Sequence, residues 1–309
     1  MRLATPHRLL LATLVLGAAL AAPVSASTVN PGDLLVTSDA TNVTNNYVGT
    51  NGLFQSAFTP SVSGLGQMAV HFHPTNGRVL IGHSSGGVDE FDSNGNYLKT
   101  YNAGGGWQWA GVYAPSGHVL IGDMLTNTVR RFNPNTGALV GMLTPVPSPA
   151  DMDFGPNGNL YVCSFYAGVV FEIDPLTGNV LNTIAPPSPS QPNDVAWNPA
   201  NGEMLISDFR ASVVHRYSYP GYVLLGDFAG TGWITPHGVA ISPHNGRVLA
   251  IAGNTGQVHE FDPLTYTELD PTFLSPDPGL KIVDLAFAPA NPTPVEKTSW
   301  GRIKSLYRK

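Results

Sequence analysis

The stretch Asp194-Val195-Ala196-Trp197-Asn198-Pro199, followed by Ala200-Asn201-Gly202, decides the fold of this protein because its pattern occurs six times. Each copy is a short segment, mostly apolar, that ends in a proline, and most copies are followed by a turn rich in Asn, Ser and Gly. The copies are 69–74, 110–115, 151–156, 194–199, 238–243 and 284–289. Their prolines lie 41, 41, 43, 44 and 46 residues apart. A repeat of about 40–50 residues is typical of the four-stranded blades of β-propellers.

Each complete repeat contains four segments of alternating polarity, which predicts four antiparallel strands. After the first strand and its turn comes a second strand, as in Asn159-Leu160-Tyr161-Val162. A third strand ends in an aromatic or aliphatic residue, as in Val129-Arg130-Arg131-Phe132. A hairpin such as Asn133-Pro134-Asn135-Thr136-Gly137 then leads to the outermost strand, and Asn and Gly suit the positive φ of such turns.

The two ends of the repeat region complete each other. The sixth repeat stops after its first strand, at Pro289, and residues 33–58 supply three further strands. We therefore predict an all-β fold, a six-bladed β-propeller of four-stranded antiparallel blades. Its last blade is closed by strands from the N- and C-terminal parts of the chain, which leaves no long open sheet edge.

Three regions are predicted along the chain. Residues 1–26 have two arginines, the apolar run 9–22 and the small-residue motif Val24-Ser25-Ala26, a pattern typical of a secretory signal peptide. Residues 27–290 form the propeller, and residues 291–309 form a basic tail. We expect the protein to be secreted or periplasmic and to have no integral membrane segment once the signal is removed. We also expect it to be a monomer. Cys163 is the single cysteine, so no intrachain disulfide can form.

Charge is unevenly divided between the propeller and the tail. Residues 27–290 contain 8 Lys and Arg against 20 Asp and Glu, a balance of −12, whereas residues 291–309 have five basic residues and one acidic, a balance of +4. Nucleic-acid affinity depends on basic contacts to phosphates, so the acidic propeller argues against a nucleic-acid partner.

The stretch 236–243, Pro-His-Gly-Val-Ala-Ile-Ser-Pro, followed by Asn245-Gly246, resembles an NHL repeat, and similar patterns recur throughout residues 33–289. NHL-like propellers include binding modules, gluconolactonases, streptogramin-lyase-type enzymes and the amidating lyase that cleaves peptidyl-hydroxyglycine. The resemblance therefore implies the architecture and leaves several activities open, because one fold hosts many functions.

In such a ring the residues just before each first strand meet at one mouth of the central channel. These positions are Met68, Trp109, Ala150, Asn193, His237 and Val283. Pro192-Asn193-Asp194 resembles a gluconolactonase blade whose Asn binds a divalent metal, and His237 resembles the zinc-binding histidines of the amidating lyase. The resemblance implies a metal site, for Ca or Zn, at Asn193 and His237 with Asp194 and Asp151 one residue deeper. Asp284 occupies the equivalent deeper position of the sixth repeat. The alternative is that these side chains cap backbone groups at the strand ends.

Other side chains near the same mouth are candidates for ligand contacts. Trp107 and Trp109 follow three glycines and could offer a flat stacking platform, or Trp109 could plug the channel. Arg210 could pair with Asp208 or bind an anionic ligand. We expect His71 to pack between blades and His73 to lie in a turn. The G-x-S-x-G match at 82–86 lies between two predicted strands, not in the strand-turn-helix setting of a nucleophile elbow.

Two functions follow from these observations. The first is an exported binding or interaction scaffold whose channel mouth and loops hold a small molecule, a glycan or a protein. The alternative is a metal-dependent hydrolase or lyase, lactonase-like, with its site at the same mouth.

Overall fold

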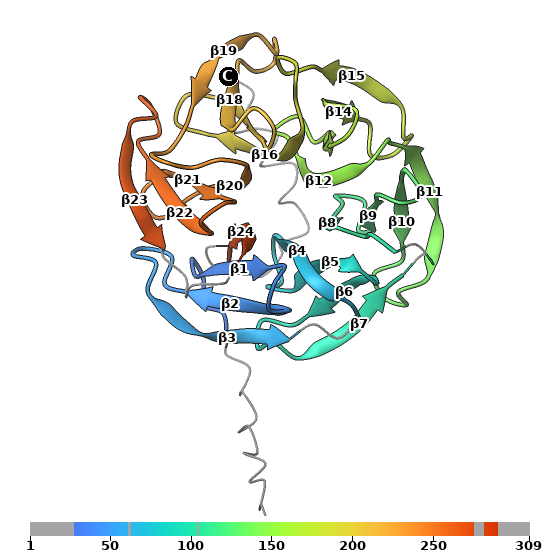
Figure 1. Cartoon of the computed structure of the whole chain (residues 1–309). Coiled ribbons are helices and arrows are strands. Elements are labelled where there is room, and N and C mark those ends of the chain that lie inside the picture. The colour runs from blue at the N-terminus through green and yellow to red at the C-terminus, as the bar shows by residue number, and fades with distance from the viewer. Residues whose placement is uncertain (1–27, 61–62, 103, 105, 275–280, 290–309) are drawn as a thin grey trace, which may run out of the picture.

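A computed structural model describes residues 28–60, 63–102, 104, 106–274 and 281–289. Six four-stranded antiparallel sheets are arranged as a ring around a central channel (Figure 1). The predicted six-bladed β-propeller is confirmed. The expected signal peptide at 1–26 and the basic tail at 291–309 lie outside the described residues. The described residues include no helix of the length and apolarity needed to cross a membrane.

The blades are numbered 1 to 6 in chain order, and the strands of each blade are named from the innermost outward. Blade 1 consists of β24 (Ile282–Phe287), β1 (Leu34–Ser38), β2 (Val43–Tyr47) and β3 (Phe54–Pro60). Blade 2 consists of β4 (Leu65–Phe72), β5 (Val79–Ser85), β6 (Val88–Phe91) and β7 (Tyr97–Tyr101). Blade 3 consists of β8 (Ala110–Tyr113), β9 (Val119–Asp123), β10 (Thr128–Phe132) and β11 (Leu139–Pro145).

The other three blades follow the same order. Blade 4 consists of β12 (Pro149–Phe154), β13 (Leu160–Ser164), β14 (Val169–Ile173) and β15 (Val180–Ile184). Blade 5 consists of β16 (Pro192–Asn198), β17 (Glu203–Asp208), β18 (Val213–Tyr217) and β19 (Leu224–Phe228). Blade 6 consists of β20 (Pro236–Ile241), β21 (Val248–Ala252), β22 (Gln257–Phe261) and β23 (Glu268–Leu274).

Blade 1 closes the ring as the sequence predicts. Strand β24 pairs antiparallel with β1, and Val36 lies opposite Leu285 although the two residues are far apart in the sequence. Both side chains are buried, at 2% and 4% exposure. Strands from the two ends of the propeller thus share one sheet, and no blade keeps an unpaired innermost strand.

The turns after the first strands explain the recurring Gly. In blade 4, Gly158 has a φ of +79°, which a side chain would disfavour, and its N–H donates to the Gly155 carbonyl at 2.9 Å.

The apolar core lies between neighbouring blades. One buried cluster, for example, joins Val112 of β8 to Met152 of β12. The blades therefore hold one another by apolar packing without crosslinks.

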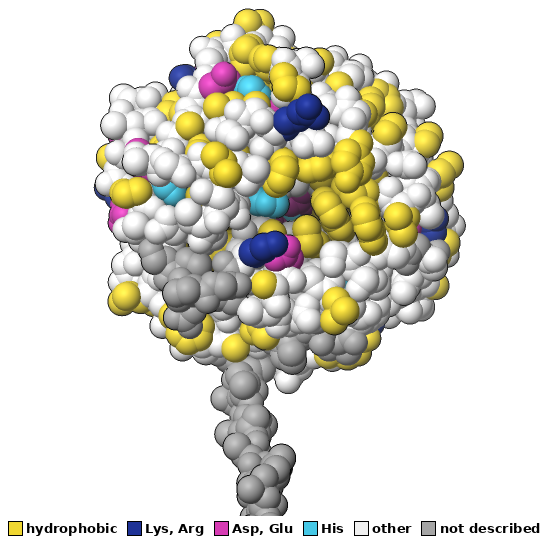
Figure 2. Space-filling model, viewed as in Figure 1, with side chains coloured by type: hydrophobic (Ala, Val, Ile, Leu, Met, Phe, Trp, Pro, Cys, Tyr) yellow, Lys and Arg dark blue, Asp and Glu magenta, His cyan; other side chains and the backbone are white. Residues whose placement is uncertain are grey.

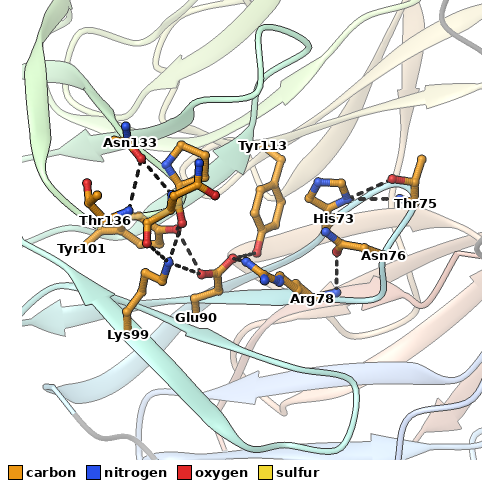
Figure 3. A network of polar contacts seen from close by, with 12 residues as sticks. His73, Thr75, Asn76, Arg78, Glu90, Lys99, Tyr101, Tyr113, Asn133 and Thr136 are labelled. Carbon is orange, nitrogen blue, oxygen red and sulfur yellow. Dashed lines mark hydrogen bonds and ion pairs between the residues drawn. The ribbon is translucent and has the colours of Figure 1, made fainter. Parts of the chain in front are cut away.

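A buried polar network also joins blades 2 and 3 (Figure 3). The Glu90 carboxylate, on β6, accepts hydrogen bonds from Tyr101 at 3.1 Å, from Tyr113 of β8 at 2.9 Å and from Arg78 at 3.3 Å. His73 lies at the turn after β4, as expected, and its ring packs edge-on against Tyr113 with centroids 4.6 Å apart. Several donors thus satisfy the carboxylate, as a buried charge requires.

Candidate functional site

The channel mouth is narrow. The side chains predicted to meet there, among them Met68, Trp109, Asn193 and His237, line one cavity of only about 10 Å³. Such a volume holds about one water molecule. The mouth is therefore filled by protein side chains, and an organic substrate has no room inside it.

Asn193 and His237, both predicted as metal ligands, contact each other directly. The Asn193 side-chain nitrogen lies 3.0 Å from His237 Nδ1. Burial, with a smaller effect of the nearby Lys281 charge, lowers the pKa of His237 to about 4. The imidazole is thus neutral at neutral pH, and its Nδ1 lies within hydrogen-bonding distance of the amide.

The three aspartates one residue deeper, Asp151, Asp194 and Asp284, line the same small cavity. Each carboxylate accepts a backbone hydrogen bond, and two of these bonds join neighbouring blades. Asp194 accepts from Val239 N and Asp284 from Val70 N, both at 2.7 Å. These hydrogen bonds support the alternative to a metal site, in which such side chains cap backbone groups at the strand ends. Burial and the charge of Asp151 raise the pKa values of Asp194 and Asp284 well above the usual range.

His71 lies in the channel, and our expectation that it packs between blades was wrong. Its Nε2 lies 2.8 Å from Asp151 Oδ1, so the pair spans the channel from blade 2 to blade 4, past blade 3. Burial lowers the pKa of His71, but the Asp151 charge and hydrogen bond outweigh that effect and raise it to about 10. His71 also lines a second, larger cavity of the channel, together with Asp153.

Among the described residues, one group of His and acidic side chains is close enough to share a metal ion. Ligand atoms of His71, Asp151 and Asp284 all lie within 4.8 Å of one another. Of this group only Asp151 belongs to the predicted metal set. The other three predicted ligands, Asn193, His237 and Asp194, lie outside the group. A divalent ion here would have to displace the proton that His71 shares with Asp151, so the donor set fits a metal only at the expense of that ion pair.

Around the mouth, aromatic side chains form a continuous series of ring contacts. Trp107 stacks on Trp109 with ring centroids 6.2 Å apart, Trp109 packs edge-on against Phe165 at 6.3 Å, and Phe165 contacts Tyr166 at 5.2 Å and Phe209 at 5.5 Å. We call these five residues, together with Leu125, the aromatic face. Figure 2 shows hydrophobic side chains gathered from the centre of this side of the disc toward the blades that contain β8 and β12.

The aromatic face is open to solvent at its outer members. Trp107 is 40% exposed, Leu125 55% and Tyr166 64%. Trp109 lines the filled mouth, as its interpretation as a plug predicts, and its ring stacks on that of Trp107; the stacking platform for a ligand stays a prediction. Phe165, Tyr166 and Phe209 were not among the predicted site residues. Phe165 and Phe209 occupy equivalent positions, each directly after the second strand of its blade.

Asp208 does not lie where a ligand could reach it, contrary to the prediction. Its side chain is fully buried within blade 5, and its oxygens accept hydrogen bonds from the backbone nitrogens of Gln191, Arg210 and Ala211 and contact His215. Arg210 is exposed, and Asp208 contacts its backbone rather than forming an ion pair with its guanidinium. Asp208 is thus a structural residue of the loop, whereas Arg210 remains a candidate for ligand contacts.

Comparison with known proteins supports the fold. No family model matches the chain, and no curated protein matches it. Among solved structures, a Bacteroides caccae protein of unknown function is 17% identical with a TM-score of 0.63, covering 83% of this chain and 98% of its own. A structure of a nidogen/laminin complex gives 14% identity and a TM-score of 0.71, with coverage of 84% and 99%. A streptogramin B lyase structure gives 13% and 0.64, with coverage of 88% and 93%. At such identities these likenesses establish the six-bladed β-propeller fold alone.

Proposed function

We propose that this protein is an exported binding propeller that holds its partner on the aromatic face beside the channel mouth. The observation that carries the proposal is the chain of aromatic rings in contact from Trp107 to Tyr166, which is exposed to solvent at these two ends. Exposed Trp and Tyr side chains are enriched at the energetic centres of binding surfaces, because they bury a large area at a small entropic cost. Contiguous apolar patches on a soluble protein commonly mark interaction sites.

The filled mouth supports binding on the surface rather than chemistry inside the channel entrance. The cavity beneath Trp109 and His237 holds about one water, so a partner contacts the rim and not the axis. Exposed Arg210 on a neighbouring loop adds a cation near this rim. A glycan stacking on the indoles or a peptide with apolar side chains would fit this surface.

The test uses the mature chain, residues 27–309, labelled with a fluorophore and applied to arrays of glycans and peptides. We expect Trp107→Ala and Tyr166→Ala each to weaken binding to the retained ligands by about 5- to 100-fold, the range of ordinary hot-spot substitutions. Tyr97→Ala is the matched control, because Tyr97 is a 46% exposed tyrosine on β7, an outermost strand. Equal affinity in all four proteins, or an equal loss with Tyr97→Ala, would contradict the proposal.

A second candidate function is a metal-dependent hydrolase or lyase. It is favoured by one observation, the ligand atoms of His71, Asp151 and Asp284 within 4.8 Å of one another. A bound divalent ion would supply a Lewis acid to polarise a carbonyl oxygen. Elemental analysis of protein purified without chelator tests this candidate. Near-stoichiometric Ca or Zn that falls on His71→Ala would favour it, and metal-free protein with no thermal stabilisation by either ion would count against it.

A further inference from the structure

The channel widens below the buried aspartates into a second cavity of about 340 Å³, which we call the lower cavity. This volume falls within the range of about 300–1,000 Å³ that small-molecule sites occupy. Most of its wall is apolar and comes from three innermost strands, residues 195–197 of β16, 239–241 of β20 and 285–287 of β24. The lower cavity therefore suits the apolar part of a small ligand.

One carboxylate in the lower cavity is only partly used by the protein. Asp153, on β12, accepts a hydrogen bond from Phe154 N through Oδ1 at 2.7 Å. Its other oxygen has no hydrogen-bond partner within the part of the chain that the structure describes. The remaining ionisable groups on the wall are His71, Asp194 and Asp284, and the last two already accept interblade backbone bonds. Asp153 is thus the acceptor that a ligand would meet.

The charge balance around the lower cavity favours a cation. The imidazolium of His71 is matched by Asp151, which leaves the carboxylate of Asp153 in excess. Ionisation of Asp194 or Asp284 would only add negative charge. None of the described residues that line the cavity is Lys or Arg. Ten of the 14 lining residues are apolar, so a cation with an organic body fits better than a hydrated inorganic ion.

We propose that the lower cavity is a binding site for a small organic ammonium ion, whose charged head lies beside Asp153 and whose apolar body packs against β16, β20 and β24. The ammonium supplies the donors that the free carboxylate oxygen lacks, and charge-assisted hydrogen bonds of this kind are stronger than neutral ones. The site lies at the opposite end of the channel from the aromatic face and does not depend on the function proposed for that face.

The test is a calorimetric titration of the mature chain with alkyl- and arylammonium ions from methylammonium to 2-phenylethylammonium. Each ammonium ion is compared with its neutral alcohol, 2-phenylethanol in the last case. We expect at least one ammonium to bind at least tenfold more tightly than its alcohol. Asp153→Asn, which keeps the side-chain shape, should abolish that preference, and Asp270→Asn at a partly exposed position of β23 should keep it.

A second variant separates charge from space. Ala240→Phe should fill the lower cavity and weaken ammonium and alcohol alike, while circular dichroism verifies that both variants are folded. Equal binding of an ammonium and its alcohol, unchanged selectivity in Asp153→Asn, or no binding of any compound at 10 mM (roughly −3 kcal/mol or weaker) would overturn the proposal. Trp107→Ala should leave ammonium binding unchanged, so this test and that of the aromatic face fail independently.

Discussion

A buried charge inside blade 2 gives the sharpest test of how the propeller is stabilised. The Asp89 carboxylate is fully buried and lies 3.0 Å from His83 Nε2; it accepts hydrogen bonds from Thr100 Oγ1 at 2.6 Å and from Ser63 N at 3.0 Å. Burial alone would raise the pKa of Asp89, but these hydrogen bonds outweigh it and lower the pKa to about 2. The carboxylate is therefore better accommodated in the folded chain than in the unfolded one.

The magnitude follows from linkage between proton binding and folding. A lowering of the pKa from 3.8 to about 2 corresponds to about 2.5 kcal/mol of stability at pH 7. Since the folded value is the lower one, this stabilisation is present above about pH 4 and is lost as the pH falls through about 2. Roughly half of it should remain at pH 3.

The perturbation is Asp89→Asn, which removes the charge and preserves the shape. Urea unfolding followed by tryptophan fluorescence should show a deficit against wild type of about 2.5 kcal/mol at pH 7 and pH 5, narrowing to about half at pH 3. Asp270→Asn, at a partly exposed position of β23, is the control and should match the wild type closely. A deficit that stays constant from pH 7 to pH 3 would refute the reasoning, because lost packing rather than lost charge would then explain it.

Three further predictions concern the core. Glu90→Ala should lower the free energy of unfolding by about 3 kcal/mol, because the tyrosine hydroxyls in Figure 3 lose their charged acceptor; a change below about 0.5 kcal/mol in urea melts would contradict this. Cys163 is buried, and burial raises its thiol pKa well above the usual range, so a thiol reagent should label the protein only after unfolding in guanidinium. Gly82→Ala should lower the melting temperature strongly, because a Cβ at this position would lie 1.8 Å from the Trp109 carbonyl oxygen. The control is Gly221→Ala, whose Cβ would make only ordinary contacts, and this variant should melt like the wild type.

The fold could be predicted from the sequence because its signals are local. Each blade repeats an alternating strand, a proline and a turn, and each of these features depends on neighbouring residues only. The missing strands of the sixth repeat could be found at residues 33–58 because strand-forming patterns are visible in the sequence without any knowledge of contacts. The pairing of Val36 with Leu285 then follows from ring closure.

The candidate site could be predicted only in part. The repeat alignment correctly brings Asn193 and His237 to the mouth, because equivalent positions of a symmetric ring converge on its axis. It could not show that these two side chains contact each other. It also placed Asp208 at the ligand surface, although the loop backbone folds around that carboxylate. Loop conformation is set by such individual contacts, which do not repeat from blade to blade.

The sequence by itself thus determined the number of blades, their strand order and the closure of the ring, since short-range periodicity and turn chemistry specify these features. Only the tertiary structure decided that the mouth is filled, that His71 pairs with Asp151 across the channel, and that Asp153 faces an open cavity at the other end. The physical reason is that these properties depend on the distances between side chains of different blades. Side-chain volumes and packing across the axis set those distances, and no single repeat contains them.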